Sequence, residues 1–148
     1  MVIQKNYAKQ LNLSDFEDKS LLILDDDDPL RGRLSRAMEK KGFRVKEAKT
    51  VAEGLQAVKN GPPPSFALVD LRLEDGNGLD VVKEIYLAKK DCRIVMLTGY
   101  GNLPTAVAAV KAGAIDYMAK PVDADDVEAA LLAAPESKAK PPENPMSA

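Results

Sequence analysis

Five side chains whose ends can carry charge or bind phosphate lie at the ends of short apolar runs in this sequence. They are Asp25, Asp26, Asp70, Thr98 and Lys120. Carboxylates that lie close together do not all stay ionised unless a cation is near, and an all-oxygen site with few protein ligands favours Mg²⁺. A lysine supplies a point charge and a threonine a hydrogen bond, and both suit a phosphoryl group. These residue types indicate Mg²⁺-assisted phosphoryl transfer to a carboxylate, which forms an aspartyl phosphate.

Apolar runs and amphipathic segments alternate along the chain, which is typical of a parallel sheet wrapped by helices. The runs expected to form strands are 21–24, 43–45, 66–69, 94–97 and 115–118. Helix boundaries are indicated by Pro29 and Pro104 near the starts, by Thr50 and Asp123 as N-caps, and by Gly42, Gly61 and Gly113 near the ends. The predicted fold class is therefore α/β, a (βα)5 doubly wound sheet of five parallel strands.

Ligands of such an open sheet bind beyond the carboxyl ends of its strands, so these polar side chains should converge on one rim. Each of them also has a simpler explanation. Asp70 could be a structural cap, Thr98 an ordinary β-branched strand residue, and Lys120 with Pro121 a turn. For Asp27 and Asp28 we prefer such an explanation, because acidic residues suit the start of a helix.

The amino-acid composition argues against several classes of function. The chain has 148 residues, a formal net charge of -2 and no histidine, which argues against a chain-wide polyanion binder and excludes histidine chemistry on this chain. The single cysteine, Cys92, cannot form an internal disulfide, and we expect a passive thiol there. No signal peptide or long apolar run is evident, so the expected location is cytoplasmic, with no membrane partner.

Three segments are expected along the chain. Residues 1–18 lack clear periodicity and form an N-terminal arm, and residues 19–134 form the α/β domain. Residues 135–148 hold four of the ten prolines and few apolar residues, which is typical of a linker. A linker at this place suggests that the natural chain continues beyond Ala148.

The order of these motifs resembles the receiver domain of two-component response regulators. An acidic pair follows the first strand, an Asp the third, a Thr the fourth and Lys-Pro the fifth, over roughly residues 19–134. The resemblance implies a flavodoxin-like fold with strand order 2-1-3-4-5. It also implies a phosphoacceptor that takes its phosphoryl group from a partner sensor histidine kinase, with no further enzymatic activity than its own phosphotransfer and dephosphorylation.

Site roles follow from the resemblance position by position. Asp70 matches the phosphoacceptor, and Asp25 and Asp26 match the acidic pair that binds Mg²⁺ together with it. Arg72, two residues past the acceptor, matches the position whose backbone carbonyl also ligates the metal. Lys120 matches the phosphate-binding lysine, and a cis peptide bond after it would aim its side chain inward.

Three further positions match the conformational switch of receivers. Thr98 matches the switch hydroxyl, and Tyr117 matches the aromatic residue that moves with it. Tyr117 is equally well explained as a core residue. Gly99 matches the small residue that leaves the phosphate accessible. The surface formed by the fourth helix, the fifth strand and the fifth helix would then change shape, with a phosphorylation-dependent homodimer as the expected result.

Two longer segments narrow the resemblance to the RegA/PrrA/ActR group of redox-responsive regulators. They are LVDLRLEDGNGLDVV and LTGYGNLPTAVAAVKAGAIDYMAKP. In that group a proline-containing linker and a Fis-type helix-turn-helix follow the receiver. The resemblance therefore implies control of transcription, with DNA bound only through a C-terminal domain that is not among these 148 residues.

Two other functions remain open at this stage. A stand-alone receiver could act as a phosphate sink or an interaction module. A small phosphohydrolase resembling the haloacid dehalogenase superfamily would also use an aspartyl phosphate and Mg²⁺. Against that enzyme, Pro29 replaces its expected Thr or Val, and Asp125 and Asp126 fall in a predicted helix instead of after a strand.

A basic stretch is the last feature with two explanations. Eight Lys and Arg residues lie between Arg31 and Lys49, and only Glu39 and Glu47 oppose them. A solvated helix face and a docking face for an acidic partner are about equally expected. Receivers contact their kinase through the first helix, which favours the docking face.

Overall fold

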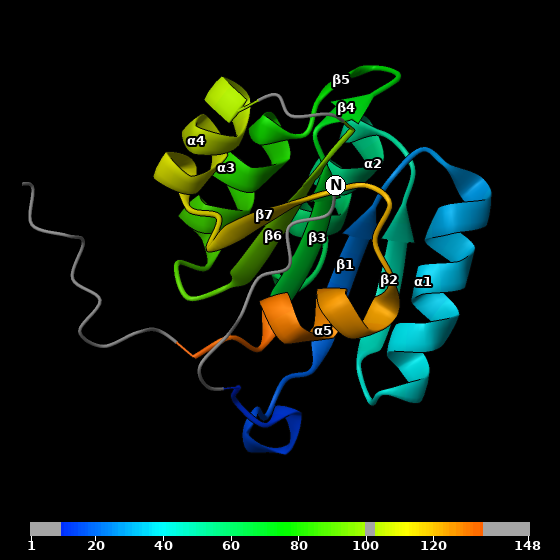
Figure 1. Ribbon diagram of the computed structural model, residues 1–148. Helices are drawn as coiled ribbons and strands as arrows, with labels where there is room; N and C mark the ends of the chain where they lie inside the picture. Colours follow the sequence, from blue (N-terminus) through cyan, green and yellow to red (C-terminus); the bar gives the residue numbers. More distant parts are fainter. Residues whose placement is uncertain (1–9, 100–102, 135–148) are drawn as a thin grey trace, which may run out of the picture.

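A parallel sheet of five strands forms the centre of the molecule in the computed structural model, which describes residues 10–99 and 103–134 (Figure 1). The strands are β1 (Ser20–Leu24), β2 (Arg44–Ala48), β3 (Phe66–Asp70), β6 (Arg93–Thr98) and β7 (Asp116–Ala119). Their order across the sheet is β2-β1-β3-β6-β7, and all neighbouring pairs are parallel. The predicted order 2-1-3-4-5 is confirmed, because β4 and β5 form a separate small hairpin.

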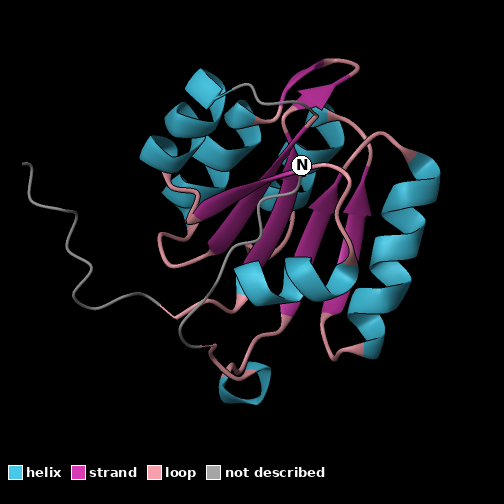
Figure 2. Cartoon of the chain, viewed as in Figure 1, coloured by secondary structure: helices cyan, strands magenta, loops and turns pink. Residues whose placement is uncertain are grey.

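Helices cover both faces of the sheet (Figure 2). They are α1 (Asp28–Lys40), α2 (Val51–Lys59), α3 (Leu79–Ala88), α4 (Leu103–Ala112) and α5 (Ala124–Leu131). The first and last pack beside each other on one face, and α3 packs between α2 and α4 on the other. This is the doubly wound arrangement that the alternation of runs predicts.

The side chains of the central strand β3 contribute to two apolar cores, one on each face of the sheet. All of its residues are buried, and successive side chains point to opposite faces of the sheet. Phe66 and Leu68 pack with the α1 and α5 side, whereas Ala67 and Val69 pack with the α2 to α4 side. The strand is therefore fixed between two apolar layers, and this sets the place of Asp70 at its end.

Helix starts and ends follow the sequence signals closely. Thr50 Oγ1 accepts a hydrogen bond from the amide of Glu53, and Asp123 caps α5 in the same way. Gly42 and Gly113 follow α1 and α4 with φ angles of 108° and 131°, a region that favours glycine. Gly61 stands at the corresponding place after α2, which ends at Lys59 with Asn60 as its C-cap, although its φ angle is not positive.

Two local features differ from the expected pattern. The second strand covers Arg44–Ala48 instead of 43–45, because its edge position requires few apolar residues. A short hairpin of β4 (Arg72–Leu73) and β5 (Gly76–Asn77) follows Asp70. Within its turn, Asp75 accepts hydrogen bonds of 2.7 and 3.1 Å from the amides of Val51 and Ala52. The hairpin is thereby tied to the start of α2.

Part of the N-terminal arm contacts the domain. A short 3₁₀ helix, η1 (Leu13–Asp15), places Leu13 in the core, and the Phe16 ring lies 4.9 Å from that of Phe66. The Leu11 amide donates to the carbonyl of Leu132 at 2.6 Å. Residues 1–9 of the arm and the linker 135–148 lie outside the described residues. Within the described ranges, no helix is long and apolar enough to cross a membrane.

Candidate functional site

The side chains singled out from the sequence converge at the carboxyl edge of the sheet. Asp70 and Thr98 are the last residues of β3 and β6, while Asp25 and Lys120 directly follow β1 and β7. The strands are parallel and paired in register, with Leu24 beside Val69 and Thr98 beside Ala119. Their ends therefore meet on one rim, as predicted.

Lys120 lies between two buried carboxylates. Its Nζ atom is 2.9 Å from Asp25 Oδ2 and 3.2 Å from Asp70 Oδ2. Asp25 is 0% and Asp70 4% exposed, so the Lys120 ammonium neutralises charge that water reaches poorly. The peptide bond between Lys120 and Pro121 is cis, as the resemblance implies.

An acidic cluster lies beside this ion pair. One oxygen from each of Asp25, Asp26 and Asp70 falls within 4.8 Å of the others, a spacing that suits a divalent cation. Asp25 Oδ1 accepts a hydrogen bond of 2.9 Å from the Asp27 amide. Asp25 Oδ2 is buried and has only its ion pair with Lys120, with no hydrogen bond of good geometry among the described residues. A hard cation would add a second partner to this buried oxygen, so the residues fit Mg²⁺.

The electrostatics of the rim favour the neutral form of one carboxyl group. The pKa of Asp70 is raised from 3.8 to about 6, because burial and the charges of Asp25 and Asp26 raise it more than the neighbouring Lys120 lowers it. Burial acts in the opposite direction on Lys120, yet the adjacent Asp25 and Asp70 raise the pKa of its ammonium above the usual value. Without metal, the cluster therefore holds more negative charge than Lys120 can balance.

Thr98 and Gly99 lie at the end of β6, the strand next to β3 with its Asp70. Thr98 is 3% exposed, and its carbonyl accepts a hydrogen bond of 2.9 Å from the Lys120 amide. Among the described residues, and apart from its chain neighbours, a Cβ atom added to Gly99 would meet nothing within 4 Å. The backbone thus joins the two residues expected to hold phosphate.

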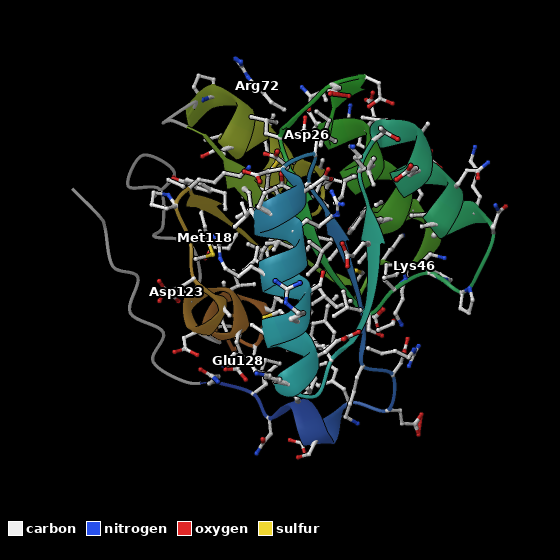
Figure 3. The ribbon with its side chains drawn as sticks, turned by 90° about the vertical axis from the view of Figure 1, so that its right-hand side faces the viewer. Asp26, Lys46, Arg72, Met118, Asp123 and Glu128 are labelled. Atoms are coloured by element: carbon white, nitrogen blue, oxygen red, sulfur yellow. The ribbon has the colours of Figure 1, made fainter. Side chains whose placement is uncertain are left out.

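Two other predicted site residues take less specific positions. Tyr117 is half-buried on β7 and packs against the apolar cluster on the α2 to α4 side, which agrees with its explanation as a core residue. Arg72 lies on β4 with an exposed side chain, two residues past Asp70. Figure 3 shows Asp26 and Arg72 at the same end of the molecule, where α1 begins.

Gly78 is a residue of this site that the sequence motifs did not indicate. A Cβ atom at position 78 would lie 2.1 Å from the backbone oxygen of Asp70 and 2.8 Å from Val69 Cγ1. The close approach of α3 to the end of β3 therefore requires glycine. The sequence signal was the D-G-N-G run, whose residues are typical of a tight turn.

Half of the eight cations in the basic stretch form ion pairs with described carboxylates. They are Arg31, Lys41, Arg44 and Lys49. Figure 3 shows one of these partners, Glu128 of α5, beside the far end of α1. Cys92 is 3% exposed, and burial raises the pKa of its thiol to about 12, which agrees with the expected passive role.

Comparisons with known proteins agree with this geometry. The family model for the response regulator receiver domain matches residues 21–132. The photosynthetic apparatus regulatory protein RegA of Cereibacter sphaeroides is 60% identical over 131 residues, which cover 88% of this chain and 71% of that protein. The acid tolerance regulatory protein ActR of Rhizobium meliloti is 57% identical, with coverage of 88% and 67%.

Solved structures show the same fold. A response regulator from Burkholderia pseudomallei, crystallised with a phosphorylated aspartic acid, a calcium ion and citrate, superposes with a TM-score of 0.72 at 38% identity. The match covers 77% of this chain and 66% of that one. A CheY-like receiver domain from Methanospirillum hungatei gives a TM-score of 0.70 at 32% identity, with coverage of 75% and 88%. The chain therefore belongs to the response regulator receiver domain family, in the group that contains RegA and ActR.

Proposed function

We propose that this chain is a phosphorylation switch in which Asp70 accepts a phosphoryl group from a phosphohistidine of a partner sensor kinase. The observation that carries the proposal is the joint placement of Asp70, the acidic pair and Lys120 on one buried rim. The sequence holds no histidine, so the donor must come from outside these 148 residues.

The transfer makes one bond and breaks one. A carboxylate oxygen of Asp70 attacks phosphorus, and the phosphorus–nitrogen bond to the donor histidine breaks as the aspartyl phosphate forms. The Asp70 carboxylate must be ionised to attack. Lys120, 3.2 Å from Asp70 Oδ2, favours that ionised form and then pairs with the phosphoryl oxygens.

A divalent cation completes the site. Asp25, Asp26, Asp70 and the backbone carbonyl of Arg72 are the groups that we propose to hold Mg²⁺, and the bound ion would neutralise charge that develops on the phosphoryl oxygens. Without it, Lys120 alone faces the charge of the carboxylates and of the incoming phosphate. Phosphorylation should therefore require Mg²⁺.

The response to phosphate is proposed to pass through Thr98 and Tyr117. The Thr98 hydroxyl moves toward the phosphoryl group and donates to it, and the Tyr117 ring fills the space that Thr98 leaves. The surface of α4, β7 and α5 then changes, which promotes self-association and, through a DNA-binding domain outside these residues, transcription control. Thr98→Ala should still accept phosphate but should self-associate less in analytical ultracentrifugation with beryllofluoride.

The phosphohydrolase alternative finds no support in the site. Asp125 and Asp126 lie in the first turn of α5, and Asp125 pairs with Lys41 at the end of α1 that is far from Asp25 and Asp26. Receiver domains are in general signalling domains, and this chain belongs to their family. Rapid turnover of a generic phosphate ester by the purified protein would be needed to favour the enzyme.

The test of the proposal is incubation with acetyl phosphate and Mg²⁺, followed by intact-mass measurement. The wild type should gain one phosphoryl group, and Asp70→Asn should gain none. Asp91→Asn is the matched control, because Asp91 is an exposed carboxylate outside the rim, and it should behave as wild type. An adduct of equal yield on Asp70→Asn would overturn the assignment.

A further inference from the structure

Three hydrogen bonds fix Asp25 in the turn between β1 and α1. Its amide donates to the carbonyl of Ala48 at 3.1 Å, and its Oδ1 atom accepts from the Asp27 amide at 2.9 Å. Its backbone carbonyl accepts from Arg31 Nη1 at 2.7 Å. Of these three bonds, only the one from Arg31 comes from another residue's side chain.

Arg31 is itself held rigidly. Its Nε atom donates to Glu47 Oε1 at 2.8 Å, and its Nη2 atom donates to Asp28 Oδ1 at 2.8 Å. The side chain is only 15% exposed. A guanidinium is planar and presents its donors in a fixed fork, so two anchored nitrogens determine where the third points. Arg31 thus connects the start of α1 and strand β2 to the carbonyl of Asp25.

That carbonyl belongs to the peptide unit that joins Asp25 to Asp26. Since a peptide unit is planar, a hydrogen bond to its oxygen restricts the rotation of the whole unit and hence the direction in which Asp26 leaves the turn. Among the residues that the structure describes, nothing forms a hydrogen bond or an ion pair with the Asp26 side chain. Its place near Asp25 and Asp70 therefore depends on the backbone.

We propose that Arg31 is a positioning residue for the divalent-cation site, acting on Asp26 through the carbonyl of Asp25. This inference rests on the proposed function, because it takes Asp25, Asp26 and Asp70 as the cation site. Outer residues that orient metal ligands commonly change metal affinity by about 10–100-fold when they are replaced. Arg31 is such an outer residue for Asp26, because it binds the carbonyl of the peptide unit that leads to Asp26.

Electrostatics and positioning predict opposite results for the loss of Arg31. Removal of a cation near the acidic cluster should by itself strengthen Mg²⁺ binding, since it relieves like-charge repulsion. Loss of the hydrogen bond to Asp25 frees the peptide unit and should weaken binding. The sign of the change in affinity therefore separates the two effects.

The experiment measures the Mg²⁺ dissociation constant by NMR titration of the Asp26 and Asp27 amides. The variants are Arg31→Met, which removes every donor, and Arg31→Lys, which keeps the charge but cannot span three acceptors. Arg33→Met is the matched control, because Arg33 is an exposed cation on the same helix. We expect about tenfold weaker binding for Arg31→Met, a smaller weakening for Arg31→Lys and no weakening for the control. The Asp26 amide signal of the metal-free Arg31 variants should also shift or broaden.

Each result bears on the proposal in a defined way. Equal or tighter Mg²⁺ binding by Arg31→Met, measured well below its unfolding temperature, would overturn it. If Arg31→Met fails to fold, Arg31→Lys decides, and wild-type affinity in that variant would overturn the proposal. Absence of Mg²⁺ binding by the wild type itself would instead refute the proposed cation site.

Discussion

Asp70→Asn should stabilise the metal-free protein at neutral pH, and the gain should disappear in acid. The Asp70 carboxyl is 4% exposed and faces the carboxylates of Asp25 and Asp26, with Lys120 as the opposing cation. Its pKa is raised in the folded protein from 3.8 to about 6. The folded state therefore takes up a proton at a higher pH than the unfolded state does.

The sign and size of the effect follow from this difference. Because the folded pKa of an acid is raised, the wild type loses stability as pH rises from about 4 to about 6, relative to a protein with no carboxyl at position 70. Each pKa unit corresponds to about 1.36 kcal/mol, so the difference between 3.8 and about 6 gives about 3 kcal/mol. The free energy of unfolding of Asp70→Asn minus that of wild type should increase by about this amount between pH 3 and pH 7.

The assay is urea unfolding of both proteins in EDTA at several pH values. Carboxylates with lowered pKa, such as Asp18, Asp28 and Asp75, are present in both proteins, so their effects cancel in the difference. Saturating Mg²⁺ should stabilise the wild type more than the variant, since a metal favours the ionised carboxylate. A difference that stays constant across this pH range in EDTA would contradict the raised pKa of Asp70.

Three further outcomes are expected. Lys120→Met should destabilise the metal-free protein toward the lower end of about 3–5 kcal/mol, because it leaves Asp25 and Asp70 without their cation, and Mg²⁺ should restore part of the loss in thermal unfolding. Gly78→Ala should lower the free energy of unfolding by about 1–3 kcal/mol or more and should slow phosphorylation, because the added Cβ would displace the Asp70 backbone. Wild-type stability and a wild-type phosphorylation rate would contradict this steric effect. Cys92 should resist iodoacetamide in the folded protein and react only after unfolding, as its thiol is buried with a pKa of about 12, and rapid labelling in buffer would contradict its passive role.

The sheet and the convergence of the rim could be predicted from the sequence because they depend on periodicity. Five apolar runs separated by amphipathic segments leave few topologies, and parallel strands bring their carboxyl ends together. Asp25, Asp70, Thr98 and Lys120 could therefore be placed on one rim before any coordinates were known. The N-caps Thr50 and Asp123 were equally accessible, because a cap depends only on residues within one turn.

Contacts between distant segments could not be predicted in this way. The hydrogen bonds from Val51 and Ala52 to Asp75 join residues more than twenty positions apart, and no local pattern marks them. The hydrogen bonds from Arg31 to Asp25 and Glu47 could not be predicted either. A run of cations in a sequence does not show which of them have partners. Such contacts depend on side-chain geometry after the chain has folded.

The chemical identity of residue 70 after phosphorylation is the most direct test of the phosphoacceptor assignment. The protein is treated with acetyl phosphate and Mg²⁺ and then with borohydride, which reduces an aspartyl phosphate to homoserine, and the peptides are sequenced by mass spectrometry. We expect homoserine at position 70 alone, dependent on Mg²⁺ and absent when the protein is first treated with EDTA. Homoserine at another aspartate, or phosphate retained on a serine or threonine with Asp70 unmodified, would contradict this assignment.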